Sequence, residues 1–266
     1  MPARFVKAFN IRNKNDAADA RAIWLAVQQP CKPVAVKTEM QQAMLALHRM
    51  RSQLMKLRTM HTNGLRGLLA EYGEVAGKGH ANLAKAMPEM LGRLSQRLPA
   101  ALIESLREQW AEVSRADERI AALEQRINEW KKQDPAVLAI SQIPGVGFLS
   151  ATAAVAAMGD AKAFRSGREF AAWAGLVPRQ TGTGGKTRLH GISKRGDKYL
   201  RTLLINGAGS VLVNAKNPGP WVERLRLRLP HKVAAAALAN KMARTIWAVL
   251  AHGRAYQKGY VSARPA

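Results

Sequence analysis

Two stretches of heptad-like sequence decide the fold: residues 40–68 read MQQAMLALHRMRSQLMKLRTMHTNGLRGL, and residues 103–130 read IESLREQWAEVSRADERIAALEQRINEW. In both, large apolar residues recur mostly at three- and four-residue steps between charged residues, which predicts two long amphipathic helices. Glycines and Pro88 separate the two stretches. An antiparallel hairpin, a dimeric coiled coil or an ordinary helical bundle would each bury the apolar faces. We expect an antiparallel coiled-coil hairpin that projects from the rest of the chain.

We divide the chain into three segments, residues 1–36, 37–133 and 134–266, of which the second is the hairpin. In the first segment Asn15 is a favourable N-cap followed by two carboxylates, which predicts a helix. Residues 33–36 fit a short strand. The third segment has glycine-rich turns between runs of small apolar residues. Its expected helices cover residues 148–158, 167–174, 197–213 and 231–250. The predicted fold class is therefore mainly α.

Charge points to the class of partner. The 266 residues include 42 Lys and Arg against 18 Asp and Glu, for a net charge of +24. Residues 134–266 hold 20 of the basic and five of the acidic residues, so the surplus is concentrated there. Such a balance indicates a polyanionic partner, and nucleic acid is the default polyanion. The hydrophobic content of 47% excludes a disordered basic tail.

Cysteine content and apolar runs exclude other classes. Cys31 is the only cysteine, which excludes a disulfide framework and a multi-cysteine zinc site. The longest apolar runs are too short or too interrupted to span a bilayer, and the N-terminal sequence is not of signal-peptide type. We therefore expect a soluble protein of a reducing compartment, without a membrane partner.

The sequence IPGVG at residues 143–147 fits the turn of a helix-hairpin-helix motif. Gly145 and Gly147 flank an apolar residue and would let backbone N–H groups meet a phosphate at the start of the next helix. The alternative is a tight turn between two packed helices. The surrounding positive charge favours the phosphate-binding interpretation.

Residues 182–187 read GTGGKT, which lacks the first glycine of a Walker loop and has no apolar strand before it. We expect a flexible loop that contacts phosphates instead. The polar groups of the loop are the hydroxyls of Thr181 and Thr183 and the cations of Arg179, Lys186 and Arg188. A hydroxyl beside cations is also a candidate nucleophile for a phosphodiester, because the cations stabilise the transition state.

A second basic run follows at residues 191–201, which read GISKRGDKYLR and contain Asp197 as their one acid. A solvated charged face would normally include more acids, so nucleic-acid binding is favoured. The expected contact residues are Lys194, Arg195, Lys198 and Arg201. Ser193 is expected to cap the helix that follows.

Asp16 and Asp19 lie three residues apart, on one face of the predicted N-terminal helix. Paired carboxylates can hold Mg²⁺ for phosphoryl transfer. The alternative is that both are simply acids favoured at the start of a helix. The six histidines show no paired metal spacing, and no Ser-His-Asp pattern emerges.

Several motifs together resemble one family along nearly the whole chain. They are residues 13–20, NKNDAADA; 41–49, QQAMLALHR; 66–73, RGLLAEYG; 143–147, IPGVG; 170–180, FAAWAGLVPRQ; and 191–197, GISKRGD. In this order they resemble the DEDD transposases of the insertion sequence 110 family. The resemblance implies that residues 1–36 are the end of a RuvC-like domain and that residues 134–266 are the transposase domain.

The resemblance also implies a function and a site. It implies DNA strand exchange by a mobile element, with a structured bridge RNA as guide and Mg²⁺ as cofactor. Asp16 and Asp19 match the third and fourth acids of the family's tetrad, and the segment with the first two is not in this sequence, so the chain looks N-terminally truncated. Threonine replaces the family's serine nucleophile: Thr183 is the best match, and Thr181 and Ser193 are alternatives.

The sequence is compatible with three functions. The first is a transposase that binds and exchanges DNA strands, as a homo-oligomer associated with the nucleoid. The second is a catalytically inactive remnant that only binds nucleic acid. The third is a basic helical protein of the nucleoid. We expect nucleic-acid binding mainly through residues 134–266, and no complete transposition by this chain alone.

Overall fold

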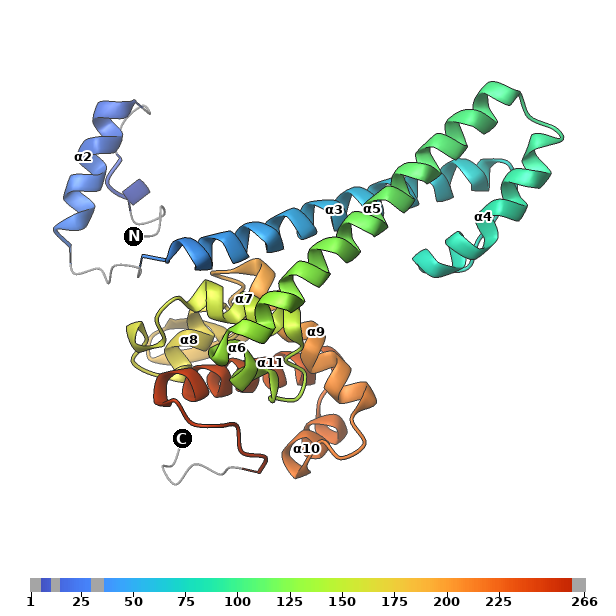
Figure 1. The fold of residues 1–266 in the computed structure, drawn as a ribbon. Coiled ribbons are helices and arrows are strands. Elements are labelled where there is room, and N and C mark those ends of the chain that lie inside the picture. The colour runs from blue at the N-terminus through green and yellow to red at the C-terminus, as the bar shows by residue number, and fades with distance from the viewer. Residues whose placement is uncertain (1–5, 11–14, 30–35, 260–266) are drawn as a thin grey trace.

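The computed structural model describes residues 6–10, 15–29 and 36–259. It is mainly helical, as predicted, and within these ranges a two-stranded antiparallel sheet is the only β-structure. Figure 1 shows a long helical arm that projects from a body built from the C-terminal half of the chain. The strand predicted at residues 33–36 falls almost wholly outside the described residues.

Helix α2 (Asp16–Val27) begins where the sequence predicts it. The side chain of Asn15 accepts a hydrogen bond from the backbone N–H of Ala18 at 2.7 Å and so caps the first turn. Ile23 and Trp24 are each more than half exposed. In Figure 1, α2 lies apart from the arm and the body. The helix therefore keeps an apolar face that the other described residues do not cover.

The arm consists of three helices, α3 (Glu39–Glu71), α4 (His80–Ser95) and α5 (Ala100–Gln133). The long helices α3 and α5 lie side by side (Figure 1). Two ion pairs between them give the register: Arg51 meets Glu124 at 2.5 Å, and Arg58 meets Asp117 at 2.6 Å. Arg58 lies seven residues after Arg51 in α3, whereas its partner Asp117 lies seven residues before Glu124 in α5. The two helices are therefore antiparallel, which was the preferred arrangement among those predicted.

Helix α4 corrects one expectation, because it occupies a stretch that was expected to be only a break. Pro88 lies inside this helix. Its apolar residues recur at three- and four-residue steps, which is the sequence signal for an amphipathic helix. They pack with α3 and α5 in a cluster at the tip of the arm: Leu65, Leu69, Leu83, Met87, Met90, Leu91, Leu94, Ile103, Leu106 and Val113.

The body follows α5 and holds the largest apolar core. Its elements are α6 (Pro135–Ser141), α7 (Phe148–Met158), η1 (Ala161–Ala163), α8 (Gly167–Trp173), β1 (Pro178–Thr183), β2 (Lys186–Ile192), α9 (Lys198–Asn214), α10 (Pro220–Arg228) and α11 (His231–His252). Helix α11 packs against α8 and α9 around fully buried Phe170, Leu204 and Ala239. The four predicted helices are present, whereas α6, η1, α10 and the two strands were not predicted. None of the described helices is long and apolar enough to cross a membrane.

A buried histidine joins the arm to the body. His48 of α3 is 1% exposed. One ring nitrogen lies 3.0 Å from the hydroxyl of Tyr199 on α9, and the other lies 3.0 Å from the hydroxyl of Thr152 on α7. Close by, the amide of Gln41 donates a hydrogen bond to the carbonyl of Gly159 at 3.2 Å. These contacts fix the base of the arm on the body.

Candidate nucleic-acid interface

Strands β1 and β2 form an exposed hairpin that carries most of the predicted contact residues. At its end Thr183 pairs with Lys186. Gly184 and Gly185 make the turn with φ values of +53° and +77°, and a type I′ turn requires positive φ at both central positions. The expectation of a flexible loop is therefore wrong. The two glycines supply a turn whose backbone twist matches that of the paired strands.

The cations of the hairpin are available to a polyanion. They are Arg179, Lys186 and Arg188, and all three side chains are exposed. None of them forms an ion pair with a carboxylate in the described ranges. Three uncompensated positive charges on one hairpin would attract backbone phosphates without reading a base sequence.

Two threonine hydroxyls accompany these cations. Thr183 is exposed beside the turn, next to Lys186 across the strands. The Thr181 hydroxyl lies 2.7 Å from Nε2 of His190 on β2. This is the distance at which an imidazole can take a proton from a hydroxyl. The sequence analysis missed His190. Thr181 pairs with Arg188, and His190 lies two residues after Arg188, so Thr181 and His190 lie on the same face of the hairpin.

The basic run that follows the hairpin continues the positive surface. Its exposed cations are Lys194, Arg195 and Lys198. Ser193 does not cap α9 as expected, since the carboxylate of Asp197 accepts the hydrogen bond from the N–H of Leu200 at 3.0 Å. The Ser193 hydroxyl is instead buried without a hydrogen-bond partner among the described atoms. Because this hydroxyl has no exposed surface and lies outside the β-hairpin, Thr183 and Thr181 are the better candidate nucleophiles.

Arg201 was predicted to contact nucleic acid, and the structure contradicts this. Its side chain is 7% exposed. One guanidinium nitrogen donates to the carbonyls of Ala174 and Arg195, at 3.0 and 3.1 Å. Arg201 therefore ties α9 to the chain after α8 and to the basic run. It supports the surface that carries the exposed cations and is not part of that surface.

The comparisons with known proteins agree with these observations. Residues 138–223 match the model of the family described as Transposase IS116/IS110/IS902. A probable family 20 transposase from Pseudomonas aeruginosa is 43% identical over 262 residues, which cover 96% of this chain and 78% of the relative. The transposase for insertion sequence element IS1111A from Coxiella burnetii is 38% identical over 259 residues, with 96% and 71% covered. The chain belongs to the IS116/IS110/IS902 transposase family.

A further transposase, that for insertion sequence element IS1328 from Yersinia enterocolitica, is 37% identical over 262 residues, with 96% of this chain and 77% of the relative covered. The resemblance inferred from the motifs is thus confirmed at the level of the family. The matched stretch, residues 138–223, runs from α6 to α10. It includes the glycine-rich turn, the β-hairpin and the basic run, so the candidate interface lies within the part that the family model describes.

In this member of the transposase family the two glycines of the α6–α7 turn have different roles. Gly145 has φ of +83°, and a Cβ there would lie 2.8 Å from the carbonyl oxygen of Gly207 on α9. Gly145 is therefore required for close packing against α9, and its predicted contact with phosphate through the backbone N–H stays a prediction. Gly147 is exposed, caps the start of α7 and leaves open space for a Cβ. Gly147 is the more exposed of the two and is open to a ligand.

The predicted carboxylate pair, Asp16 and Asp19, lies on α2. Both acids are in its first turn, and the Asp19 carboxylate accepts a hydrogen bond from the amide of Asn10 at 2.7 Å. No third His, Cys, Asp or Glu joins Asp16 and Asp19 in a metal-binding group within the part of the chain that the structure describes. Mg²⁺ in proteins is usually held by one or two carboxylates together with waters and substrate phosphates, so Asp16 and Asp19 stay candidate ligands without a third protein ligand in the described ranges.

Proposed function

We propose that this protein binds DNA through its body and exchanges DNA strands as a transposase. The observation that carries the proposal is the exposed β1–β2 hairpin, on which two hydroxyls stand among cations without a described carboxylate partner. Its cations, together with the exposed lysines and arginine of the basic run, would hold backbone phosphates whatever the base sequence. Membership of a transposase family supports the same function.

The proposed chemistry is attack of a threonine hydroxyl on a DNA phosphodiester. Oγ1 of Thr183 forms a bond to phosphorus, and the bond from phosphorus to the leaving deoxyribose oxygen breaks. The hydroxyl proton passes to a base, and the leaving oxygen takes up a proton. Lys186 and Arg188 would stabilise the charge on the phosphate oxygens. The DNA–threonine ester can then be rejoined to a second strand by the reverse reaction.

Thr181 is the second candidate for the nucleophile, and a specific distance favours it. Its hydroxyl lies 2.7 Å from Nε2 of His190, which can serve as the base. Thr183 keeps priority because it precedes the Gly-Gly-Lys sequence that the resemblance matches to the serine loop. The two candidates predict different loss-of-function variants.

Mg²⁺, a guide RNA and a homo-oligomer are further proposals that rest on the family resemblance. Asp16 and Asp19 would supply two of the carboxylate ligands of Mg²⁺, and the other ligands would come from outside the described residues. A structured RNA would select the DNA partners. The RNA and Mg²⁺ proposals are tested by omitting each component from the strand-exchange reaction, and the carboxylate proposal by replacing Asp16 and Asp19. The oligomer proposal is tested by measuring the mass of the active assembly.

DNA binding is tested by fluorescence anisotropy of the full chain with a labelled duplex at several salt concentrations. The double variant Lys186→Gln/Arg188→Gln should bind about tenfold more weakly. It should also lower the slope of log affinity against log salt by about two, because two phosphate contacts are lost. The matched control is Arg107→Gln/Arg126→Gln, which removes two exposed charges from α5. Equal losses in both pairs would contradict binding through the hairpin.

The nucleophile is tested by trapping the covalent DNA–protein complex on a denaturing gel, with guide RNA, donor DNA, target DNA and Mg²⁺ present. Thr183→Ala should abolish the complex, and Thr183→Ser should retain it, since serine offers the same hydroxyl with less crowding. Loss in Thr181→Ala and His190→Ala, with Thr183→Ala still active, would assign the reaction to the second pair. DNA binding without any complex would favour the inactive remnant.

A further inference from the structure

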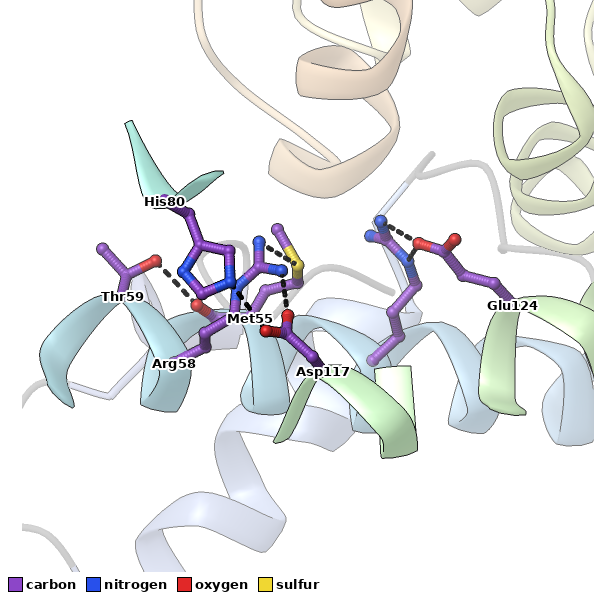
Figure 2. A network of polar contacts seen from close by, with 7 residues as sticks. Met55, Arg58, Thr59, His80, Asp117 and Glu124 are labelled. Atoms are coloured by element: carbon purple, nitrogen blue, oxygen red, sulfur yellow. Dashed lines mark hydrogen bonds and ion pairs between the residues drawn. The ribbon is translucent and has the colours of Figure 1, made fainter. Parts of the chain in front are cut away.

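A polar pocket on the arm lies away from the hairpin and has no role in the proposed function. Its volume is about 180 Å³, and it opens between α3 and the start of α4. The lining residues are Arg58, Thr59, Thr62, Asn63, Arg66, Gly79 and His80. Figure 2 shows Arg58 of α3 and His80 of α4 side by side, with the carboxylate of Asp117 of α5 in contact with both.

Positive charge exceeds negative charge around this pocket. Arg58 and His80 both bind one carboxylate, that of Asp117, at 2.6 and 2.7 Å. The guanidinium of Arg66 instead donates to backbone carbonyls, among them those of Ala76 and Gly79. Carbonyls orient a guanidinium without cancelling its charge. Two arginines therefore face the pocket with a single carboxylate to balance them.

The start of α4 adds an electrostatic preference for anions. Gly79 is its N-cap, and no side chain caps the helix or places an acid in its first turn. The backbone N–H groups of a first helical turn have no partner inside the helix and carry the positive end of the helix dipole. Gly79 and His80 bring this end of the helix to the pocket wall.

An unpartnered buried hydroxyl gives independent evidence for a ligand. Thr62 is 7% exposed, and its Oγ1 has no hydrogen-bond partner among the described atoms. Its neighbour Thr59 shows the usual alternative, since that hydroxyl donates to the carbonyl of Met55 four residues earlier at 2.8 Å. A buried polar atom without a partner is costly and calls for an explanation. A bound oxyanion would accept the missing hydrogen bond.

We propose that this arm pocket binds a phosphate group of a nucleic-acid backbone. Arginine side chains, a free helix N-terminus and a hydroxyl donor are the groups that recognise phosphate oxygens. The volume corresponds to about six water molecules at about 30 Å³ each, which is room for one phosphate and a few waters. Only the source of the phosphate rests on the proposed nucleic-acid binding; the pocket chemistry does not.

Inorganic phosphate is the first probe, titrated into the full chain at constant ionic strength. The readout is the set of backbone amide NMR signals of residues 79–83, which report the pocket and not the body. These signals should shift with saturation in the wild-type protein. Thr62→Val removes the hydroxyl without breaking a hydrogen bond, so it should fold normally and weaken phosphate binding at least fivefold. Arg58→Gln should weaken it similarly.

Arg51→Gln is the matched control, because Arg51 forms the other α3–α5 ion pair, one heptad from Arg58 (Figure 2 shows its partner Glu124). It should bind phosphate like the wild type. Signals that do not move with phosphate would overturn the proposal. So would equal titrations in the wild type, Thr62→Val and Arg58→Gln, or an equal loss in Arg51→Gln.

Two labelled nucleic acids then distinguish the sources of the phosphate: a 30-nucleotide RNA stem-loop and a DNA duplex of the same length. If Thr62→Val weakens binding of the RNA but not of the duplex, the phosphate comes from RNA. If it weakens binding of the duplex but not of the RNA, the phosphate comes from DNA. Unchanged affinity for both, with phosphate binding intact in the wild type, overturns the nucleic-acid assignment. Lys186→Gln/Arg188→Gln should leave the phosphate titration of the arm unchanged, so failure of the hairpin proposal is recognised separately.

Discussion

We expect low pH to destabilise the contact between the arm and the body through His48. Burial, and to a smaller extent the charge of Arg51, lower its pKa from 6.5 to about 4. Between these two pH values the unfolded chain binds a proton that the folded chain does not. Stability should therefore fall as pH drops from about 6.5 to 4, by about 3 kcal/mol in total, and should not change through this group above pH 6.5.

Urea unfolding at pH values from 4 to 7.5 measures this slope. His48→Gln can keep polar contacts to Thr152 and Tyr199 but does not titrate, so its stability should vary less with pH over the same range. Parallel pH profiles for the wild type and His48→Gln would show that other groups cause the dependence.

Comparing Arg201 with Lys198 distinguishes a residue that stabilises the interface from one that is expected to contact DNA. Both belong to α9, one turn apart, but only Arg201 is buried and bonded to two carbonyls. Arg201→Ala should lower the free energy of unfolding by about 2–3 kcal/mol, because buried carbonyls lose a charged donor. Lys198→Ala should change stability by less than about 0.5 kcal/mol and should weaken DNA binding. Denaturant unfolding and anisotropy on both variants check the contrast.

At the level of elements, the α6–α7 turn tests whether its glycines serve packing or phosphate binding. Gly145→Ala would place a Cβ against the Gly207 carbonyl at a positive φ, and should destabilise the fold by about 3 kcal/mol. Gly147→Ala meets no atom within 4 Å and has φ of −73°, so it should fold like the wild type. Similar melting temperatures for the two variants would refute the packing role of Gly145.

Elements also differ in how well local sequence marks them. The heptad-like runs mark α3 and α5, since a long apolar stripe requires a helix-sized partner surface. The hairpin was missed although its Gly-Gly turn is a strong local signal, because its strands are polar and exposed and lack the alternation of a half-buried strand. Helix α4 was missed because Pro88 and the glycines before it are usual helix breakers.

For the molecule as a whole, the arm predicts an elongated shape in solution. The 33 residues of α3 span about 50 Å at a rise of 1.5 Å per residue. A compact globule of 266 residues would have a radius of gyration of about 18 Å. Small-angle X-ray scattering should give a clearly larger value, with the mass from forward scattering separating the shape of one chain from that of an oligomer. A value near 18 Å at the mass of one chain would contradict a projecting arm.

The sequence by itself determined the helical class, the two long arm helices, the charge of the C-terminal half and the family. These depend on periodicity, composition and order of motifs, all of which are local or additive along the chain. The tertiary structure alone decided which polar residues are reachable. Arg201 and Lys198 differ little as sequence, yet packing buries only Arg201. Gly145 and Gly147 are alike as sequence, yet only Gly145 packs closely against α9. The tertiary structure also places Thr181 beside His190 and Arg58 beside His80. These contacts join separate elements and therefore depend on how those elements pack.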